Sequence, residues 1–398
     1  MRIRSFRRRA SKGRRAPDRF EATVRGNRVT LLHDGAACLP AMLDLIASAE
    51  RELLFEMYWF GSDRTGRRFA EALSERARRG VKVCVIYDAA GSFEADESMF
   101  EQMRRAGCDV REFNPIAPWR RRFEIGLVNH RDHRKILVAD QSVAMTGGVN
   151  AGDPWAPQAE GGQGWRDDMI RIEGVAALSM REVFLQTWRA LGGEEEPTPT
   201  MSESELRATG ADLPEHGSPV RVLANHYRAQ RAAIRRTYLE QIARASSNIY
   251  IANSYFIPGR AVRRALAEAA GRGVEVKVLL PGEYDVAAAH FAGRRLYDWL
   301  MRHGVEVHEW RGTVLHAKTA TIDDRWCTVG TYNLDHRSWR ANLEVNVAVA
   351  DEGVATAMAD RFRADLERSE RIDPHHWRFR PLSERLLEHF FYLFRKLL

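Results

Sequence analysis

The feature that most constrains the fold of this 398-residue chain is an internal repeat. An apolar stretch rich in aromatic residues occurs twice, about half a chain apart, at Leu53–Phe60 and Ile249–Ile257. Each copy is followed by a helix-like segment that ends in Arg-Gly-Val and runs into a second apolar stretch, at Arg79–Tyr87 and Arg272–Leu280. Because strands that alternate with helices usually pair in parallel through crossover connections, we predict an α/β protein. Its two tandem α/β halves should contain mixed, mostly parallel sheets packed as a pseudo-two-fold pair.

The composition divides the chain further. Hydrophobic residues make up 44% of it, which is enough to bury a sizeable core and excludes a chain that is disordered throughout. The net charge of +7 comes from the first 19 residues, which hold nine basic residues against one Asp and predict a disordered basic arm. The expected segments are an arm at 1–26, an N-terminal half at 27–190, a Gly-, Glu- and Pro-rich linker at 191–218, a C-terminal half at 219–370 and an amphipathic C-terminal segment at 371–398.

No stretch reaches the ~18–20 consecutive apolar residues that a membrane-spanning helix needs, so we expect at most a peripheral membrane protein. Three segments could reach a bilayer. Anionic lipid would attract the basic arm, and Pro381–Leu398 carries apolar residues at helical spacing flanked by Arg and Lys, as in an in-plane helix. The third segment combines aromatic and basic side chains that suit a membrane interface: Trp119, Arg120, Arg121, Arg122 and Phe123.

The pattern His-x-Lys-x-x-x-x-Asp occurs once in each half, at the same place in the repeat. The copies are His133, Lys135 and Asp140, and His316, Lys318 and Asp323. Chance is a poor explanation, because the chain has only six Lys and two of them lie in these motifs. A glycine-containing turn and an asparagine follow each copy, ending at Asn150 and Asn333. The duplicated pattern is therefore a candidate active site.

The spacing within each motif has a chemical consequence. Residues two apart on a strand point to the same face, so each motif presents an imidazole beside an ammonium group. Two such pairs around one pocket suit a phosphodiester. The Lys cations would hold the non-bridging oxygens, one neutral His would attack phosphorus and form a covalent intermediate, and the other His, protonated, would protonate the leaving alcohol. Asn150 and Asn333 can donate hydrogen bonds to the phosphate. A strand cannot bring Asp140 or Asp323 to the same phosphate, so we interpret both as structural residues at strand ends.

The sequence also argues against a bound cofactor. It contains no Gly-x-x-x-x-Gly-Lys-Ser/Thr loop for a nucleotide and no clustered carboxylates typical of a two-metal site. The cysteines lack metal-binding spacing and read as small buried residues in a reducing compartment: Cys38, Cys84, Cys108 and Cys327. We therefore expect neither a metal nor another cofactor.

The two motifs with their turns, HRKILVAD with GGVN and HAKTATID with GTYN, resemble the two signatures of the phospholipase D superfamily. Three further segments are similar to those of bacterial cardiolipin synthases: ANSYFIP at 252–258, WRD at 165–167 and VGTYNLDHRSWRANL at 329–343. The resemblance covers roughly residues 27–370. Members of this branch often carry N-terminal membrane helices, and the chain resembles the shorter form without them.

The resemblance implies a phosphatidyltransferase that needs no metal or nucleotide. A phosphatidyl group would pass from phosphatidylglycerol to a His, releasing glycerol, and a second phosphatidylglycerol would accept it to give cardiolipin. By the same resemblance His133 is the nucleophile and His316 the general acid and base, while Asp167 and Glu344 orient the imidazoles by accepting hydrogen bonds from Nδ1. The expected partners are phosphatidylglycerol, other phospholipids and the membrane surface, on the cytoplasmic face of the bacterial inner membrane.

Several alternatives stay open at this point. With water as the acceptor the same site would be a phospholipase D-type hydrolase, and phosphatidylethanolamine is a second possible acceptor. A nuclease of the same superfamily would use the same His/Lys pairs, but the ANSYFIP segment and the apolar C-terminal segment favour lipid, so no nucleic acid partner is expected. Either histidine is a possible nucleophile, and the oligomeric state is open. Candidates for the acceptor side are Asp335, Arg337 and Ser338.

Overall fold

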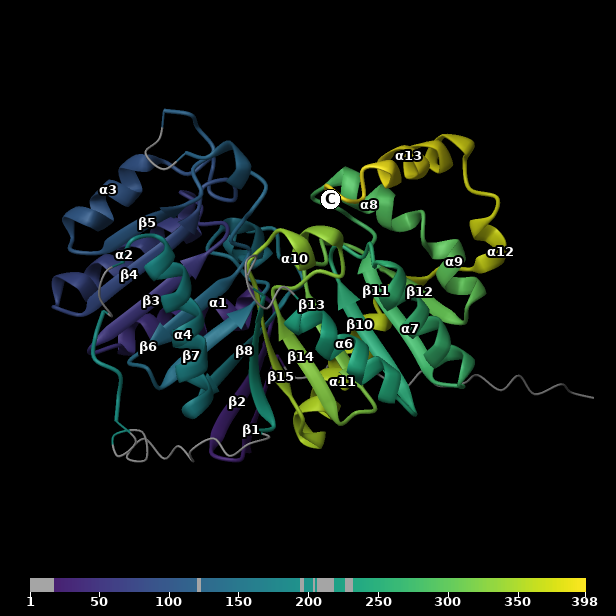
Figure 1. The fold of residues 1–398 in the computed structure, drawn as a ribbon, viewed down its shortest axis with the longest axis horizontal. Helices are drawn as coiled ribbons and strands as arrows, with labels where there is room; N and C mark the ends of the chain where they lie inside the picture. Colours follow the sequence, from purple (N-terminus) through teal and green to yellow (C-terminus); the bar gives the residue numbers. More distant parts are fainter. Residues whose placement is uncertain (1–17, 120–122, 194–196, 203–204, 206–217, 226–231) are drawn as a thin grey trace, which may run out of the picture.

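The computed structural model describes residues 18–119, 123–193, 197–202, 205, 218–225 and 232–398. Two α/β halves lie side by side, each built around an eight-stranded sheet (Figure 1). The sheet of the N-terminal half has the order β1-β2-β8-β7-β6-β3-β4-β5. Its strands are β1 (Arg19–Val24), β2 (Asn27–His33), β3 (Glu52–Met57), β4 (Lys82–Asp88), β5 (Asp109–Phe113), β6 (Lys135–Ala139), β7 (Val143–Gly147) and β8 (Asp168–Glu173).

The sheet of the C-terminal half has the order β16-β12-β11-β10-β13-β14-β15-β9. Its strands are β9 (Val220–Asn225), β10 (Asn248–Asn253), β11 (Glu275–Pro281), β12 (Val305–Trp310), β13 (Lys318–Ile322), β14 (Trp326–Gly330), β15 (Glu344–Val349) and β16 (Ser369–Arg371). Apart from the edge strands β1 and β16, this order repeats that of the N-terminal half strand for strand. The two sheets therefore form the predicted pseudo-two-fold pair.

Both sheets are mixed, as predicted, but the expectation that parallel pairing dominates is wrong. Parallel pairs are confined to β3-β4-β5 and β10-β11-β12, whose strands are joined through helices. The other neighbours are antiparallel. The short connection after each motif explains the difference. Only residues 140–142 join β6 to β7, and only residues 323–325 join β13 to β14, and a connection this short must reverse the chain.

Helices cover the outer faces of the sheets and also fill the space between them. In the N-terminal half they are α1 (Asp34–Ser48), α2 (Arg64–Arg78), α3 (Glu97–Arg105) and α4 (Val175–Ala190), with short 3-10 turns η1 (Ile125–Leu127), η2 (Asp153–Trp155) and η3 (Gln158–Glu160). In the C-terminal half they are α6 (Ala233–Arg244), α7 (Arg260–Gly271), α8 (Ala287–Arg294), α9 (Tyr297–Arg302), α10 (His336–Arg340), α11 (Glu352–Leu366), α12 (Pro374–Trp377) and α13 (Leu382–Leu393).

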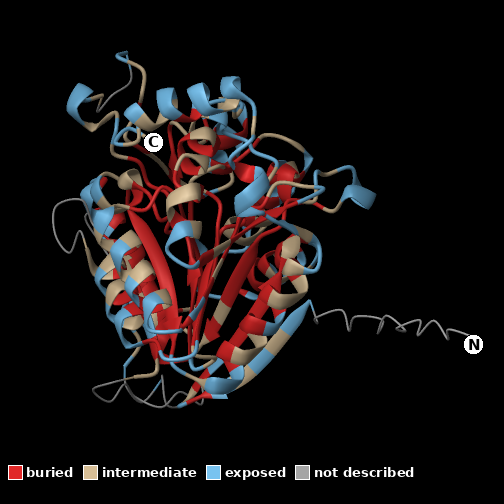
Figure 2. Cartoon of the chain, turned by 90° about the vertical axis from the view of Figure 1, so that its right-hand side faces the viewer, coloured by how far each residue is buried: buried red, intermediate tan, exposed pale blue. Residues whose placement is uncertain are grey.

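The two sheets share an apolar core, which holds the halves in a defined relation. Ile136 and Ile170 from the N-terminal sheet belong to the same buried cluster as Val345 and Val347 from the C-terminal sheet. Side chains of α4 and α11 complete this cluster, and Figure 2 shows the sheets as the buried centre of the molecule. A fully buried side chain of this kind contributes about 1.5–3 kcal/mol. The position of one half relative to the other is thus set by packing.

The prediction of a disordered arm at residues 1–26 is wrong for the last part of that segment. Residues 19–24 form β1, which pairs antiparallel with β2 along its whole length. Residues 1–17 lie outside the described part of the chain. Most of the predicted linker also lies outside it, at 194–196, 203–204 and 206–217. The described piece at 197–202 packs on the N-terminal half, where the Thr198 hydroxyl donates to Glu52 at 2.7 Å.

The C-terminal segment forms helices α12 and α13, and α13 packs beside α8. None of the helices that the structure describes is long and apolar enough to cross a membrane.

Candidate active site

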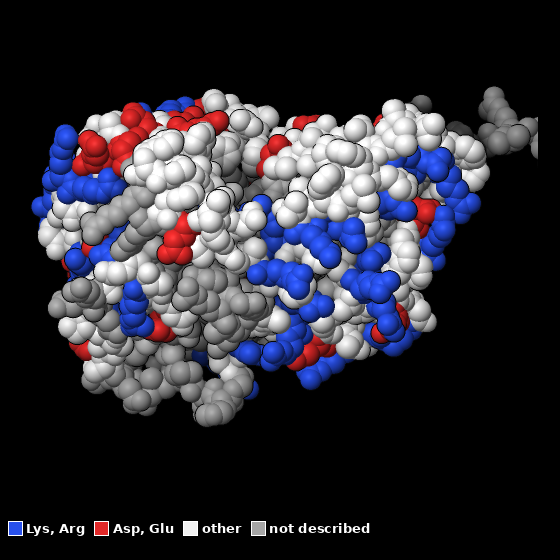
Figure 3. All heavy atoms as spheres, turned by 45° about the horizontal axis from the view of Figure 1, so that its top comes forward, with Lys and Arg blue, Asp and Glu red and all other residues white. Residues whose placement is uncertain are grey.

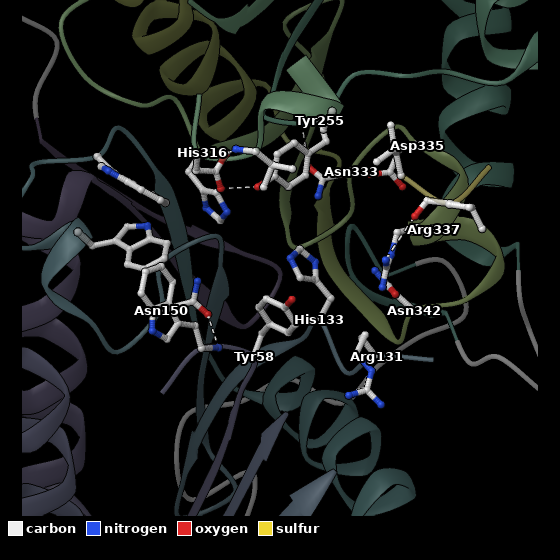
Figure 4. A pocket seen from close by; sticks show the side chains of 18 residues that line it. Tyr58, Arg131, His133, Asn150, Tyr255, His316, Asn333, Asp335, Arg337 and Asn342 are labelled. Carbon is white, nitrogen blue, oxygen red and sulfur yellow. Dashed lines mark hydrogen bonds between the residues drawn. The ribbon is translucent and has the colours of Figure 1, made fainter. Parts of the chain in front are cut away.

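The two motifs meet where the halves join. His133 directly precedes the Lys-containing start of β6, and His316 stands in the same place before β13. The main chain of each histidine is held by the opposite half. His133 N donates to Leu343 O at 3.0 Å, and His316 N donates to Arg166 O at 2.7 Å. Figure 4 shows both imidazoles pointing into one pocket. The pocket is therefore built jointly by the two halves.

The two predicted carboxylates hold the histidines in a crossed arrangement. Glu344, at the start of β15 in the C-terminal half, accepts from Nδ1 of His133 at 3.1 Å. Asp167, just before β8 in the N-terminal half, accepts from Nδ1 of His316 at 2.8 Å. An ionised carboxylate can only accept a hydrogen bond, so Nδ1 of His133 carries the proton and its Nε2 lone pair is left for the pocket. The same holds for His316 while Asp167 is ionised. Both imidazoles are thus oriented as nucleophiles or bases.

Burial sets the charge of the histidines and lysines. It lowers the pKa of His133 to about 4 and, helped by the charge of Lys318, lowers the pKa of His316 well below its ordinary value. It also lowers the pKa of Lys135 to about 7 and that of Lys318 to about 8, and Lys318 adds to the effect on Lys135. The imidazoles are therefore neutral at pH 7, and both lysines titrate close to neutrality. An entering phosphate anion would raise all four pKa values.

The lysines are positioned by hydrogen bonds to neutral oxygens nearby. Lys135 Nζ donates to His133 O at 2.8 Å, and Lys318 Nζ donates to the Ser254 hydroxyl at 2.8 Å and to His316 O. Neither ammonium group forms an ion pair with a carboxylate within the described residues. Their positive charge is therefore left for an anionic ligand.

The two asparagines line the same pocket. The side-chain oxygen of Asn150 accepts from Trp59 N at 3.0 Å, and that of Asn333 accepts from the Ser254 hydroxyl at 2.9 Å. Because the oxygens are engaged, each amide is fixed with its NH2 group as the available donor. Both asparagines can therefore donate to phosphate oxygens.

The pocket has a volume of about 230 Å³ and two unlike walls. The wall beside His316 is aromatic, with Trp155 and Trp165 packed at 5.3 and 5.7 Å from its ring. The side of the pocket away from His316 is polar and contains Asp335, Arg337 and Asn342 (Figure 4). The two walls suit different parts of a substrate, such as an apolar chain and a polar head group.

Sequence reasoning missed several residues of the pocket. Tyr58 packs edge-on at 4.9 Å from the His133 ring, and Trp59 and Tyr255 line the pocket nearby. The repeat contained a signal for them, because Tyr58–Trp59 and Ser254–Tyr255 follow equivalent strands, β3 and β10. No such signal marked Asp285, which lies in the loop between β11 and α8 and accepts from the Tyr255 hydroxyl.

The aspartates of the two motifs lie away from the pocket, at the strand ends. The Asp140 carboxylate accepts from the backbone N–H groups of residues 50–52 at 2.7–2.9 Å. Asp323 accepts in the same way from residues 246–248. Both residues have left-handed backbone conformations, with φ of 47° and 56°, which Asp tolerates better than most residues. Each aspartate thus ties its hairpin to the start of a neighbouring strand.

The three residues predicted for the acceptor side do not all reach the pocket. Asp335 and Arg337 line the pocket. Ser338 is buried behind it, where its hydroxyl donates to Glu344 at 2.7 Å. Of these three residues, Ser338 therefore supports the carboxylate rather than the ligand.

The predicted lipid-contact segment is only partly described. The Trp119 side chain is 85% exposed, and Phe123 is half-buried. Arg120, Arg121 and Arg122 lie outside the described residues.

No group of three or more potential metal ligands occurs in the part of the chain that the structure describes.

Comparison with known proteins identifies the family. The family model "Cardiolipin synthase, PLD-like domain" matches residues 42–158 and 238–366. The chain is 31% identical to the "Probable cardiolipin synthase YwiE" of Bacillus subtilis, over 92% of this chain and 71% of that protein. It is 30% identical to a cardiolipin synthase of Geobacillus thermodenitrificans, over 91% of this chain and 70% of that protein.

Solved structures share the fold. The phosphatidylserine synthase of Haemophilus influenzae superposes with a TM-score of 0.70 at 14% identity, over 92% of this chain and 95% of that one. The polyphosphate kinase of Porphyromonas gingivalis superposes with a TM-score of 0.58 at 14% identity, over 87% of this chain and 49% of that one. The family model and the sequence relatives show that the chain belongs to the cardiolipin synthase family of the phospholipase D superfamily.

Proposed function

We propose that this protein is a phosphatidyltransferase that makes cardiolipin from two molecules of phosphatidylglycerol, releasing glycerol, through a covalent phosphohistidine. The observation that carries the proposal is the paired site. It contains two neutral imidazoles, each held at Nδ1 by a carboxylate of the opposite half. Each motif also supplies a lysine that has no carboxylate partner among the described residues. The chemistry exchanges one phosphodiester for another, so it needs no outside source of energy.

In the first step Nε2 of His133 attacks the phosphorus of phosphatidylglycerol. The bond from phosphorus to the glycerol oxygen breaks, and His316 gives its proton to that oxygen. The negative phosphate raises the pKa of His316 when it binds, so that this imidazole is protonated when needed. Lys135 and Lys318 hold the non-bridging oxygens, where charge builds up in the transition state.

In the second step the hydroxyl of another phosphatidylglycerol attacks the phosphohistidine. His316 takes the proton of that hydroxyl, the new phosphorus–oxygen bond forms, and the bond from His133 to phosphorus breaks. The products are cardiolipin and the free enzyme. Water in place of the second lipid would give phosphatidic acid, so the acceptor decides between transferase and hydrolase.

The carboxylates support this division of roles. Burial alone would raise the pKa of Glu344, but hydrogen bonds from His133 and Thr331 and the charge of Lys135 keep the pKa below its ordinary value. An ionised Glu344 stabilises the positive charge that His133 acquires on phosphorylation. Burial raises the pKa of Asp167 to about 7, so the His316–Asp167 pair can gain and lose a proton near neutrality, as a general acid and base must.

The test is mass spectrometry of the products that the purified protein makes from phosphatidylglycerol in mixed micelles. Cardiolipin and glycerol are expected, and both should be lost in His133→Ala and in His316→Ala. His303→Ala, which removes an exposed histidine at the end of α9, is the matched control. Phosphatidic acid as the sole product would make the protein a hydrolase, and no lipid product would overturn the proposed donor.

The protein also needs access to a bilayer, and exposed apolar side chains surround its pocket. Val286 and Leu397 both line the pocket and are 42% and 61% exposed. The loop that carries Trp119 and the helix α13 rise on the same side of the molecule (Figure 1), and this face has a broad area without charged side chains (Figure 3). Exposed apolar side chains on α13 are Leu382, Leu386, Leu387, Phe390 and Leu393. This face would lie on the lipid surface, with α13 in the plane of the interface.

The four cysteines are free, which fits a reducing compartment. We place the protein on the cytoplasmic face of the bacterial inner membrane, as a peripheral enzyme.

The membrane contact of α13 is tested by binding of the protein to vesicles that contain phosphatidylglycerol. Leu386→Ser with Phe390→Ser should weaken binding about 10–100-fold, because two partly inserted apolar side chains are lost. Phe390→Leu should bind normally, and activity on a soluble short-chain substrate should survive in all variants. Unchanged binding of the double variant would rule out α13 as the contact.

A further inference from the structure

One cation of the pocket has no role in the chemistry described so far. Arg337 lines the pocket from α10, and within the described part of the chain its guanidinium donates one hydrogen bond, to the main-chain oxygen of Leu397 at 3.4 Å. The second arginine of the pocket, Arg131, is in a different position. It is 2% exposed, and its guanidinium is committed to Asp88 and to the main-chain oxygens of Asn114 and Leu127. Of the two, only Arg337 is available to a ligand.

The position of Arg337 is tied to the catalytic centre. Asp335 begins α10 by accepting from Ser338 N at 2.7 Å, and Ser338 in turn donates to Glu344, the carboxylate that holds His133. Figure 4 shows Arg337 beside Asp335 and Asn342, on the His133 side of the pocket. Burial raises the pKa of Tyr58 to about 12, and the positive charge of Arg337 opposes this rise. Arg337 therefore lies within electrostatic range of the ring that packs against His133.

The proposed reaction requires a second anion in the pocket. The acceptor phosphatidylglycerol carries its own phosphodiester one glycerol unit away from the hydroxyl that attacks. Lys135 and Lys318 are occupied by the phosphoryl group that is transferred, so the second negative charge needs another cation. A guanidinium suits this task because its planar fork binds two phosphate oxygens at once.

We propose that Arg337 binds the phosphodiester of the acceptor lipid and thereby selects an acceptor hydroxyl that lies one glycerol unit from a phosphate. This inference rests on the proposed phosphatidyl transfer and names the acceptor class that the site prefers. Arg337 is then a specificity-determining residue of the second step, and it favours lipid over water.

The test compares two soluble acceptors with the same donor, phosphatidylglycerol. Glycerol 3-phosphate and glycerol each offer a primary hydroxyl, but only the first carries a phosphate. We expect the wild type to prefer glycerol 3-phosphate about tenfold or more in kcat/KM, and the preference to fall to about one in Arg337→Gln. Arg337→Lys should retain part of the preference for glycerol 3-phosphate, because an ammonium group keeps the positive charge but cannot bind two phosphate oxygens as the guanidinium does. Exchange of labelled glycerol into phosphatidylglycerol involves no second phosphate, so Arg337→Gln should reduce this exchange less than it reduces transfer to glycerol 3-phosphate.

Arg340→Gln is the matched control, since it removes an exposed charge from the same short helix and should keep the preference. An unchanged preference in Arg337→Gln, or an equal loss with both acceptors, would overturn the inference. These results can be told apart from a failure of the proposed function. If the wild type uses soluble acceptors but makes no cardiolipin from phosphatidylglycerol, the lipid acceptor is wrong while the acceptor ratio still tests Arg337.

Discussion

The two halves share a scaffold and a motif, yet they surround their histidines differently. His133 packs on Tyr58 and is held by Glu344, whereas His316 lies between two tryptophans and is held by Asp167. In both cases the carboxylate comes from the opposite half. Neither half alone provides both the motif histidine and the carboxylate that holds it, so the duplicated fold gives one site rather than two.

The difference in surroundings produces a difference in charge. Glu344 accepts from the Thr331 and Ser338 hydroxyls as well as from His133, and hydrogen bonds from His133 and Thr331 lower its pKa against the effect of burial. Asp167 accepts from Trp155 and His316, and burial raises its pKa to about 7. The two copies of the motif thus differ in the charge of their carboxylates, as the proposed division into a nucleophile in one half and a proton carrier in the other requires.

The largest expected effect concerns the different roles proposed for His133 and His316. A donor lipid with a p-nitrophenol leaving group needs no proton, so it separates the nucleophile from the general acid. His316→Ala should keep the first step, seen as the initial burst of p-nitrophenol, within about tenfold of the wild type, but should lose about 10²–10⁴-fold with phosphatidylglycerol. His133→Ala should lose at least about 10⁴-fold with both donors. A burst of p-nitrophenol in His133→Ala, with none in His316→Ala, would exchange the two roles.

The next effect compares the two carboxylates. Glu344→Gln should lower kcat by about 10³-fold, because it removes an ionised partner and no longer fixes the tautomer of His133. Asp167→Asn should lower kcat by about 10–100-fold, because this carboxylate is already partly protonated at pH 7. The measurement is steady-state cardiolipin formation by variants shown by circular dichroism to be folded. Equal losses would mean that the two pairs carry the same charge.

A smaller effect concerns pH. The lysine ammonium groups must be protonated to hold the phosphate, and burial lowers their pKa to about 7 for Lys135 and about 8 for Lys318. The contribution of the two lysines to phosphate binding is present at pH values below these pKa values and is lost as the pH rises through them. We expect kcat/KM to fall above pH 7–8, and Lys135→Met, although less active, to begin its fall about one pH unit higher. A wild-type profile that stays flat to pH 9 would contradict this reading.

The smallest effect is on stability and should be equal in the two halves. Asp140→Asn and Asp323→Asn each weaken a charged acceptor of several backbone N–H groups while keeping a residue that tolerates a left-handed backbone. Each should reduce the free energy of unfolding by about 1–2 kcal/mol. Urea denaturation measures this change. Loss of activity in the folded variants beyond about twofold would show that these residues reach the site after all.

Much of the site could be predicted because its residues belong to a repeated local pattern. His133, Lys135 and Asn150 recur in register with His316, Lys318 and Asn333, and the structure brings both sets to one pocket. The pattern did not reveal the antiparallel hairpin after each motif, since strand direction depends on a three-residue connection. Nor did it reveal β1, where residues counted as part of a charged arm alternate apolar side chains against the sheet.

By itself, the sequence determined the two halves, the paired motifs and the class of chemistry, because residues two apart on a strand share a face wherever that strand lies. Only the tertiary structure decided which carboxylate serves which histidine, because Glu344 and His133 are 211 residues apart and meet through packing of the two sheets. It also decided which arginine is available, since Arg131 and Arg337 differ only in the partners that folding brings to them.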